Sequence, residues 1–387
     1  MKTPVVLVTA SLAIATALAA TFLIATSTRG DSASFTSSAG KLEVETIATG
    51  LAYPWGLAFL PDGRMIVTEK PGRIRLVTRE GQLSPPLAGT PEVWYSGQGG
   101  MLDVAVDKSF VQNGTIYFCY AERASGGGRT TVARGKLNDS SPPRLTDVRV
   151  IFRQDGRLSS GNHYGCRIAQ APDNSLFISL GDHYSARDQA QTLDNHIGKV
   201  VRISPEGAAP KDNPFTDRGD AKPEVWSYGH RNSQSLAFNP ATGDLWEIEH
   251  GPRGGDEINI IGKGKNYGWP VIGYGIDYSG AKLHASTSKD GMEQPVKYWV
   301  PSIAPSGMAF YTGNLFPKWK GSLLVGALAG QMLVRLPLNG NTVGAEERIL
   351  QNLNERIRDV RQGPDGAIWL LTDNSAGRIL RVTPAAK

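Results

Sequence analysis

Residues 358–382 read RDVRQGPDGAIWLLTDNSAGRILRV and show the pattern that decides the fold. A short apolar strand is followed by a Pro-Asp-Gly turn, a second apolar strand, a polar loop and a third strand. The same pattern begins at three earlier points, with GLAFLPDGRMIVTEKPGRIRLV at Gly56, RIAQAPDNSLFISLGDH at Arg167 and LAFNPATGDLWEIEHGPRGGDEINII at Leu236. The chain is therefore built from a repeated, strand-rich unit.

Two looser copies of the unit, beginning at Met101 and Met308, fill the gaps and bring the total to six. Strand-rich units that recur at roughly 40–70 residues are typical of propeller blades, which bury their faces against neighbouring blades. We therefore expect an all-β, six-bladed β-propeller over residues 41–387, with the site on the central axis at one face. Residues 42–49, LEVETIAT, form a lone strand that should complete the last blade. A β-sandwich whose turns recur by coincidence is the alternative.

The N-terminal stretch has the composition of an export signal. Between Lys2 and Arg29 there is no charged residue, and the side chains are mostly small or apolar. We expect residues 1–26 to be a secretory signal peptide, with Ala17-Leu18-Ala19 as a cleavage site, or else an uncleaved N-terminal anchor. Residues 27–40, STRGDSASFTSSAG, are rich in Ser and predict a flexible linker. The expected location is the periplasm, with the anchor as the one contact to a membrane.

The totals exclude several classes of function. The 387 residues are 40% hydrophobic and 20% charged, and the 45 Gly and 24 Pro indicate many turns rather than long helices. A net charge of +5 would help to attract an acidic ligand, but the basic run that marks nucleic-acid binding is absent. The motifs H-E-x-x-H and G-x-S-x-G and the phosphate-binding P-loop are also absent. Cys119 and Cys166 are the only cysteines, and export leaves open both a disulfide and two buried thiols.

Charged and imidazole side chains concentrate between Trp226 and Pro270, in a segment punctuated by Gly, Asn, Asp and Pro. Gly251-Pro252 lies in its middle, where the chain must turn and cannot join a strand ladder. Backbone carbonyls in such a turn stay free to face a hard cation. A β-hairpin with a solvated, charged loop explains the segment equally well.

Further candidates precede the repeats, where the loops of a propeller converge on the axis. Gln98 has three Gly neighbours, which allow close approach of the backbone to a ligand or simply form a turn. His163 precedes the third unit, and Asp182 follows the strand expected to pair beside it. A carboxylate on one ring nitrogen fixes the tautomer and leaves the other nitrogen as a general base. A structural histidine is the alternative.

Arginines stand at two further entrances to the repeats. Arg231 and Asn232 precede the fourth unit, and Arg356 and Arg358 lie where the sixth begins. Arg356 and Arg358 alternate around Ile357, so on a strand both guanidinium groups point to the same face. Each arginine alone could be a solvated surface residue, but three at equivalent entrances favour a ligand that carries several negative charges.

The chain resembles the soluble quinoprotein sugar dehydrogenases, the glucose/sorbosone dehydrogenase family, in the ordered motifs GQGG, NHYGCR, GDH, YGHRN, EHGPRGGDEIN, KNYGWP and RIRDV. The resemblance is nearest to the aldose sugar dehydrogenase branch and covers about residues 45–384. It implies a six-bladed propeller that binds pyrroloquinoline quinone (PQQ) and Ca²⁺ on its axis. It also implies oxidation of aldose sugars at C1 to lactones, with hydride transfer to the quinone and electrons passed to an external acceptor.

The resemblance assigns roles to single residues as well. His163 corresponds to the general base, Asp182 to the carboxylate that orients it, and Arg231 to the arginine beside the reacting carbonyl. The implied cofactor contacts are Gln98, Asn232, Arg356 and Arg358. The implied Ca²⁺ ligands are the carbonyls of Gly251 and Pro252 for the catalytic ion, and Glu257 with the carbonyl of Tyr267 for a second, structural ion.

Two positions depart from the glucose dehydrogenases of this family. Ala329 follows Leu328 where those enzymes have a lysine, and Asn162 precedes the base where they have an aspartate. Both departures argue against the glucose-specific branch, with its narrow specificity and tight cofactor binding. The short loops of the chain suggest an open site that accepts a broad range of aldoses. A metal-dependent lactonase and a non-catalytic binding propeller are the alternative functions. The sugar, the acceptor and the choice between monomer and homodimer are left open.

Overall fold

The computed structural model describes Met1 and residues 30–386, apart from residues 157 and 159. The expected signal peptide or anchor, Met1 aside, and residues 27–29 of the expected linker lie outside the described residues. In the part of the chain that is described, no helix has the length and apolar character needed to cross a membrane.

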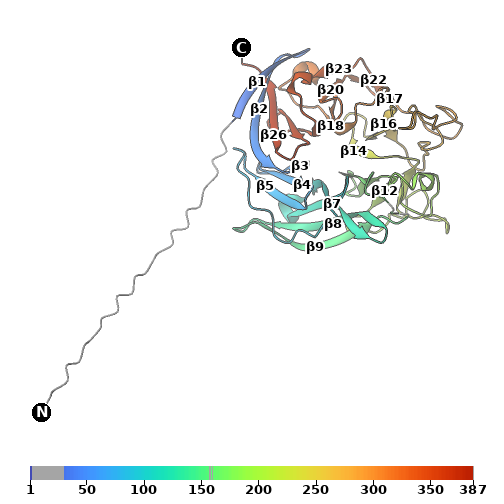
Figure 1. Cartoon of the computed structure of the whole chain (residues 1–387), viewed down its shortest axis with the longest axis horizontal. Coiled ribbons are helices and arrows are strands. Elements are labelled where there is room, and N and C mark those ends of the chain that lie inside the picture. Colours follow the sequence, from blue (N-terminus) through green and yellow to red (C-terminus); the bar gives the residue numbers. More distant parts are fainter. Residues whose placement is uncertain (2–29, 157, 159, 387) are drawn as a thin grey trace.

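The architecture is a six-bladed β-propeller (Figure 1), as the repeats predict. Each blade is an antiparallel sheet, and the first strand of each blade contacts the first strand of the next around the axis. The first blade contains β3 (Pro54–Phe59), β4 (Met65–Glu69) and β5 (Arg73–Val77). The second contains β6 (Met101–Val106), β7 (Thr115–Ala124), β8 (Gly127–Asn138) and β9 (Arg144–Arg153). The third contains β10 (Gly165–Gln170), β11 (Leu176–Leu180), β12 (Lys199–Ile203) and β13 (Val225–Tyr228).

The remaining blades follow the same order. The fourth contains β14 (Ser233–Phe238), β15 (Leu245–Glu249), β16 (Asp256–Ile261) and β17 (Lys297–Trp299). The fifth contains β18 (Pro305–Phe310), β19 (Leu323–Ala327), β20 (Met332–Leu336) and β23 (Glu347–Ile349). The sixth contains β24 (Ile357–Gln362), β25 (Ile368–Thr372), β26 (Gly377–Pro384), β2 (Gly40–Leu51) and β1 (Gly30–Ser37). The loops hold the hairpin β21 (Leu338–Asn339) with β22 (Thr342–Val343), and the short helices α1 (Phe110–Asn113), η1 (Arg187–Gln191), η2 (Pro317–Trp319) and η3 (Gln351–Leu353).

Pro-Asp-Gly turns and a Pro-Asp-Asn variant join the first and second strands of three blades. Gly63 and Gly366 have φ of 85° and 78°, and Asn174 takes the same place in the third blade with φ of 69°. These left-handed conformations suit Gly and Asn, which is why the turn signal recurs in the sequence. The strands that follow, β4, β11 and β25, are buried at every residue, because packing covers both of their faces.

The N-terminal strand closes the ring, as predicted for residues 42–49. β2 pairs with β26 from the pair Leu42–Pro384 to the pair Leu51–Gly377. Figure 1 shows β2, in blue, beside β26, in red. The last blade therefore combines strands from both ends of the folded chain.

The prediction of a flexible linker over residues 27–40 is wrong for the part that is described. Gly30–Ser37 form β1, which pairs with β2 and adds a fifth strand to the last blade. Phe35 packs against the core cluster that includes Leu42, and Ser38 hydrogen-bonds the carboxylate of Glu347 through its amide and its hydroxyl. The Ser-rich composition concealed one large apolar side chain, Phe35, and strand β1 covers the edge that β2 would otherwise expose.

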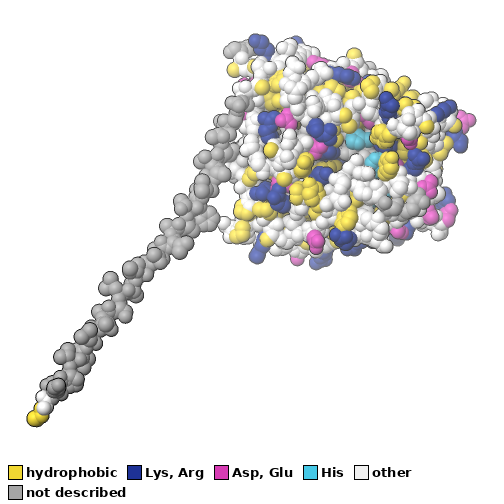
Figure 2. Space-filling view, viewed as in Figure 1, with side chains coloured by type: hydrophobic (Ala, Val, Ile, Leu, Met, Phe, Trp, Pro, Cys, Tyr) yellow, Lys and Arg dark blue, Asp and Glu magenta, His cyan; other side chains and the backbone are white. Residues whose placement is uncertain are grey.

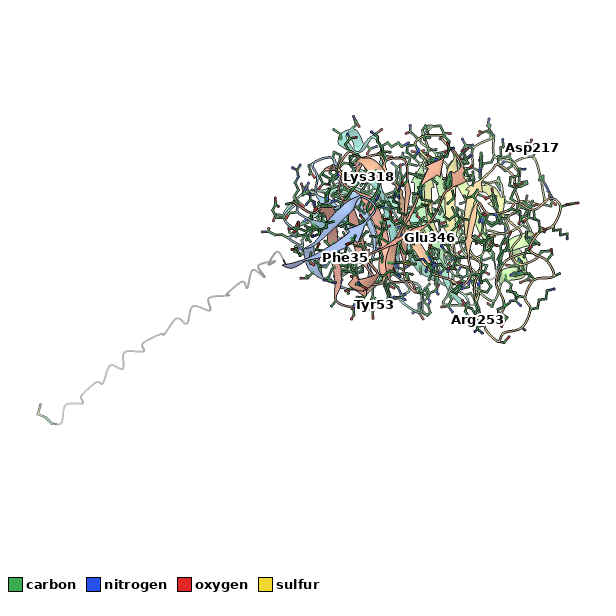
Figure 3. The ribbon with its side chains drawn as sticks, turned by 90° about the horizontal axis from the view of Figure 1, so that it is seen from above. Phe35, Tyr53, Asp217, Arg253, Lys318 and Glu346 are labelled. Carbon is green, nitrogen blue, oxygen red and sulfur yellow. A yellow bond between two sulfur atoms is a disulfide. The ribbon has the colours of Figure 1, made fainter. Side chains whose placement is uncertain are left out.

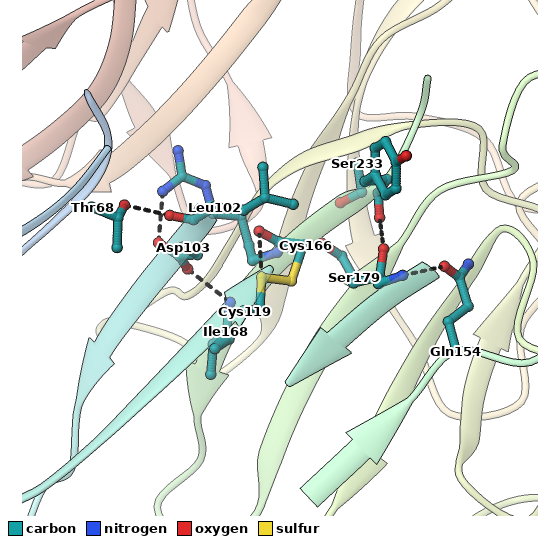
Figure 4. The surroundings of a disulfide bond; sticks show 12 residues. Thr68, Leu102, Asp103, Cys119, Gln154, Cys166, Ile168, Ser179 and Ser233 are labelled. Carbon is teal, nitrogen blue, oxygen red and sulfur yellow. Dashed lines mark hydrogen bonds and ion pairs between the residues drawn. A yellow bond between two sulfur atoms is a disulfide. The ribbon is translucent and has the colours of Figure 1, made fainter. Parts of the chain in front are cut away.

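A disulfide joins Cys119 in β7 to Cys166 in β10 (Figure 4), which resolves the alternative left open by the sequence. Both residues are buried, and their Cα atoms are 6.5 Å apart, a separation that a disulfide can span. The bond ties the second blade to the third, and Cys166 lies three residues after His163 in the chain.

Candidate active site

Equivalent residues of several blades meet in one cavity of about 230 Å³, which we call the axial cavity. The second residue of the innermost strand contributes to its lining in four blades, as Trp55, Leu102, Gln234 and Arg358. Because the blades radiate from the axis, residues at the same position of different blades converge there although they lie far apart in the sequence.

A second blade position also lines the axial cavity. The first residue after the second strand contributes in four blades, as Lys70, His250, Leu328 and Asp373. This position holds two charged residues, Lys70 and Asp373, that none of the sequence arguments singled out. The sequence could have pointed to them if the first residue after each predicted second strand had been taken as a position that lines the axis.

The candidate site lies on one face of the propeller. Figure 3 places Tyr53, which precedes β3, and Arg253, which follows Pro252, at the same face. Figure 2 looks at the molecule along the view of Figure 1 and shows histidine side chains near the middle of the propeller, with Lys and Arg side chains close to them. This arrangement agrees with a site on the axis.

Positive charge exceeds negative charge in the axial cavity. Arg356 and Arg358 both donate to Oδ2 of Asp373, at 3.0 and 3.2 Å, so two guanidinium groups share one carboxylate. Arg358 is buried, and its Nε has no hydrogen-bond partner among the described residues. Burial lowers the pKa of Arg358; Asp373 opposes this shift, and the positive charges of Arg167 and Arg356 add to it. An anion in the cavity would supply the missing partner.

Gln98 reaches the axial cavity on a loop that packs tightly against the segment before His163. Its amide donates to the carbonyl of Gly161 at 2.8 Å, and its Oε1 accepts a hydrogen bond from the amide of His163 at 2.8 Å. Gly97 has φ of 58°, and a Cβ added to it would lie 2.4 Å from the oxygen of Gly161. The glycine beside Gln98 is therefore needed for the close approach of these two backbones.

His163 and Asp182 line a small cavity together with Arg231 and Trp269. Nδ1 of His163 lies 2.7 Å from Oδ1 of Asp182, and the other carboxylate oxygen accepts from Nε1 of Trp269 at 2.7 Å. A carboxylate that accepts from Nδ1–H leaves Nε2 without a proton. Burial lowers the pKa of His163; the bond to Asp182 opposes this shift, and Arg231 adds to it. The imidazole is therefore neutral at pH 7, in the form that accepts a proton.

Arg231 lines both this cavity and a neighbouring one around Gly251 and Pro252. Its Nη1 donates to the carbonyl of His250 at 2.9 Å, and its guanidinium carbon lies 5.1 Å from the centre of the Trp269 ring. Its Nε is buried and has no hydrogen-bond partner in the described part of the chain. A cation held in this way can stabilise negative charge that forms on a ligand beside it.

Asn232 occupies a different place from the other implied cofactor contacts. It is buried, and its Oδ1 accepts from Nε2 of Gln234 at 3.1 Å. Gln234 lines the axial cavity, whereas Asn232 is not among the described residues that line it. Asn232 thus orients a cavity residue that the motifs did not assign.

The third cavity, of about 20 Å³, combines carboxylates with free carbonyl oxygens. Its lining includes Glu249, Glu257, Gly251, Pro252 and Tyr267. The carbonyl oxygens of Gly251, Pro252 and Tyr267 accept no hydrogen bond from the described residues. Burial raises the pKa of Glu257, and the negative charge of Glu249 adds to this shift. Neighbouring carboxylates, one buried and one partly buried, and free carbonyl oxygens suit a hard cation such as Ca²⁺.

The three cavities adjoin one another. His250 lines both the axial and the third cavity, and Trp269 lines both the third cavity and that of His163. Trp269 lies in the quoted motif KNYGWP but had no assigned role, because its contact with Asp182 joins loops 87 residues apart. The structure thus gathers ten of the eleven candidate residues around one connected site, with Asn232 behind it.

Comparisons with known proteins identify the family. A model of the glucose/sorbosone dehydrogenase family matches residues 51–381. The chain is 46% identical over 347 residues to the aldose sugar dehydrogenase YliI of Escherichia coli, which covers 89% of this chain and 93% of that protein. A crystal structure of a glucose dehydrogenase is 48% identical, with a TM-score of 0.86, and covers 89% of this chain and 99% of the other. The PQQ-bound form of an aldose sugar dehydrogenase from Streptomyces coelicolor is 29% identical, with a TM-score of 0.74, and covers 88% of this chain and 98% of the other. Because the family model spans all six blades, the chain belongs to the glucose/sorbosone dehydrogenase family.

Proposed function

We propose that the protein is a PQQ- and Ca²⁺-dependent aldose sugar dehydrogenase that oxidises aldoses at C1 to lactones. The observation that carries the proposal is the imidazole of His163, which a buried carboxylate orients and which adjoins a cavity with a surplus of positive charge. The PQQ-bound relative supports the cofactor, and the aldose sugar dehydrogenase from E. coli supports the substrate class.

In this proposal His163 acts as the general base. Its Nε2 accepts the proton of the C1 hydroxyl while the hydride leaves C1, so that the sugar loses two electrons and becomes a lactone. Asp182 stabilises the imidazolium that forms, because its Oδ1 lies 2.7 Å from Nδ1. Arg231 lines the same cavity and stabilises the negative charge that develops on the hydride acceptor.

The residues of the axial cavity fit PQQ. The cofactor is a planar anion with three carboxylates, and the cavity offers an indole from Trp55, an amide from Gln98 and the guanidinium groups of Arg356 and Arg358. The Nε of Arg358, which has no hydrogen-bond partner among the described residues, marks a place for an acceptor. When bound, the quinone supplies the hydride acceptor, and Ca²⁺ polarises its carbonyl.

The residues of the third cavity fit Ca²⁺. Gly251 and Pro252 would hold the catalytic ion through their carbonyl oxygens, to which no described residue donates a hydrogen bond. Glu257 and the carbonyl of Tyr267 would hold the second, structural ion. Oxygen ligands of this kind are those that Ca²⁺ prefers.

The alternatives explain less. A lactonase on this fold would hold its metal at the axis with carboxylate and asparagine side chains, but the described lining of the axial cavity contains one carboxylate, which is paired with arginines. A binding propeller gives no reason for the pairing of His163 with Asp182. We also propose that the enzyme is exported to the periplasm and passes its electrons to an external acceptor.

Reconstitution tests the proposal. Protein depleted of metal with EDTA and freed of quinone should be inactive, and should gain dye-linked aldose oxidation only when PQQ and Ca²⁺ are both added. A panel of aldoses in the same assay should show a broad range of substrates. Full activity in EDTA-treated protein without added quinone would contradict the proposal.

A further inference from the structure

Lys70 lines the axial cavity from the first blade, directly after β4. Its Nζ donates to the carbonyl of Gly97 at 3.2 Å, and it lies 5.9 Å from the ring centres of both Tyr53 and Tyr95. A carbonyl and two aromatic rings thus hold the ammonium group at the cavity without neutralising its charge.

The charges around Lys70 are mostly positive, so an anion bound beside it would be stabilised. The described lining of the axial cavity contains three cations, Lys70, Arg356 and Arg358, and a single carboxylate, Asp373, which is paired with the two arginines. Burial lowers the pKa of Lys70, and Arg358 adds to this shift more than Arg356 does, while Asp373 opposes it.

The fifth blade adds no cation to this set. Leu328 and Ala304 are its residues in the cavity lining, and Ala329, next in the turn after β19, is uncharged. Within the described lining of the axial cavity, a ligand with three carboxylates therefore meets two arginines, and Lys70 is the third cation there.

We infer that Lys70 is a cofactor-binding residue, whose ammonium group pairs with one carboxylate of the quinone. The inference rests on the proposed function. The same side chain positions a neighbouring contact, because Gly97, which accepts from Lys70, adjoins Gln98, whose Oε1 accepts from the amide of His163. Lys70 thus connects the anion site to the loop that packs against the general base.

The test is a quinone titration of the metal-loaded apoprotein, read by quenching of protein fluorescence rather than by activity. Lys70→Met keeps the length of the side chain and removes its charge, so the dissociation constant for PQQ should rise about tenfold to a hundredfold. Lys70→Arg should stay within a few-fold of the wild type. Lys108→Met is the matched control, since Lys108 is an exposed lysine on the loop after β6 and should leave the affinity unchanged.

A quinone whose three carboxylates are esterified separates charge from shape. Its binding should be equally weak in the wild type and in Lys70→Met, because the anion that Lys70 recognises is gone. An unchanged PQQ affinity in Lys70→Met would overturn the inference while leaving the proposed function in place. The inference would also be overturned if Lys108→Met lost as much PQQ affinity as Lys70→Met. The same holds if Lys70→Met bound the esterified quinone that much more weakly than the wild type does. A wild type that binds no quinone at all would overturn the proposed function first.

Discussion

Replacement of Asp182 by asparagine is the most direct test of the pair that it forms with His163. Every partner of the carboxylate is a donor. Oδ1 accepts from His163 and from the amide of Tyr184 at 2.7 Å each, and Oδ2 accepts from Trp269 at 2.7 Å. An asparagine of nearly the same volume offers one oxygen only, so its NH₂ group must face a donor.

The size of the effect follows from these contacts. If the NH₂ group faces His163, Nδ1 becomes an acceptor, the proton moves to Nε2 and the base is lost; if it faces Trp269, a buried indole N–H is left unpaired. In either orientation the imidazolium formed during the reaction loses a charge-assisted contact, worth about 1.5–3 kcal/mol, or about tenfold to a hundredfold in kcat. His163→Ala removes the base itself and should cost about 10²–10⁴-fold while the quinone stays bound.

Single-turnover reduction of the bound quinone by sugar, followed against pH, measures this effect. In the wild type the rate should fall as the pH drops through the pKa of His163, because the base must be neutral. Asp182 raises that pKa against the effect of burial, so Asp182→Asn should lower the plateau and move the acidic limb to lower pH. If Asp182 had only a structural role, its replacement would lower the melting temperature and the quinone occupancy but leave the acidic limb of the pH profile in place. An acidic limb that stays or moves upward would refute the reasoning.

Three further predictions concern cofactor, disulfide and metal. Arg358→Ala should weaken PQQ binding about tenfold to a hundredfold and more than Arg356→Ala, because their side chains are 11% and 44% exposed; equal losses in a titration would contradict this order. Joint replacement of Cys119 and Cys166 by alanine should cost about 4 kcal/mol of unfolding free energy for a bridge across 47 residues; chemical denaturation measures this, and an unchanged value would count against a stabilising bond. Glu257→Gln should weaken Ca²⁺ binding and reduce the rise in melting temperature that Ca²⁺ gives, and an unchanged Ca²⁺ titration would remove Glu257 from the metal site.

The fold could be predicted because its signals are local. The turns at Gly63, Asn174 and Gly366 need left-handed conformations, so the residues that permit them recur at the same place in each copy. The ring closure could also be predicted, since one unpaired strand precedes the first blade. Strand β1 could not, because Phe35 is the one large apolar side chain in a segment whose composition is that of a linker.

The site was predictable where a motif carries its own chemistry, as with His163 and Asp182. The lining of the axial cavity was not, because it depends on where each second strand ends. Glu69 is the last residue of β4 and Lys70 the first beyond it, so a shift of one residue would decide which of two opposite charges faces the cavity. The role of Trp269 could not be predicted for another reason, because its partner Asp182 belongs to a different blade.

All six innermost strands share an irregularity that explains how one residue can line the axial cavity while the next residue lies beneath the lining. In each of them the pairing register shifts near the start of the strand, as between Met101 and Val104 in β6. Such irregularities re-aim side chains that strict alternation would send to opposite faces. The third residue of an innermost strand can then build the support beneath the cavity lining. In three blades these residues are Asp103, Arg167 and Asp359, and the guanidinium of Arg167 lies 3.0 and 3.1 Å from the two carboxylates and 4.3 Å from the centre of the Trp55 ring.

This buried network joins the second, third and sixth blades directly beside the residues that line the axial cavity. Arg167 is fully enclosed, so its charge is stabilised only while both carboxylates stay in place. Arg358 is the neighbour of Asp359 in β24, and its own guanidinium lies 5.7 Å from the centre of the same Trp55 ring. Arg361 adds the second cation of this network, with Nη2 3.5 Å from Asp103 and 3.2 Å from Asp359. The arginine and lysine side chains that line the cavity are therefore held by strands that a second, balanced set of charges joins together. A propeller can in this way carry a surplus of positive charge on its axis without relying on the ligand to hold its blades in register.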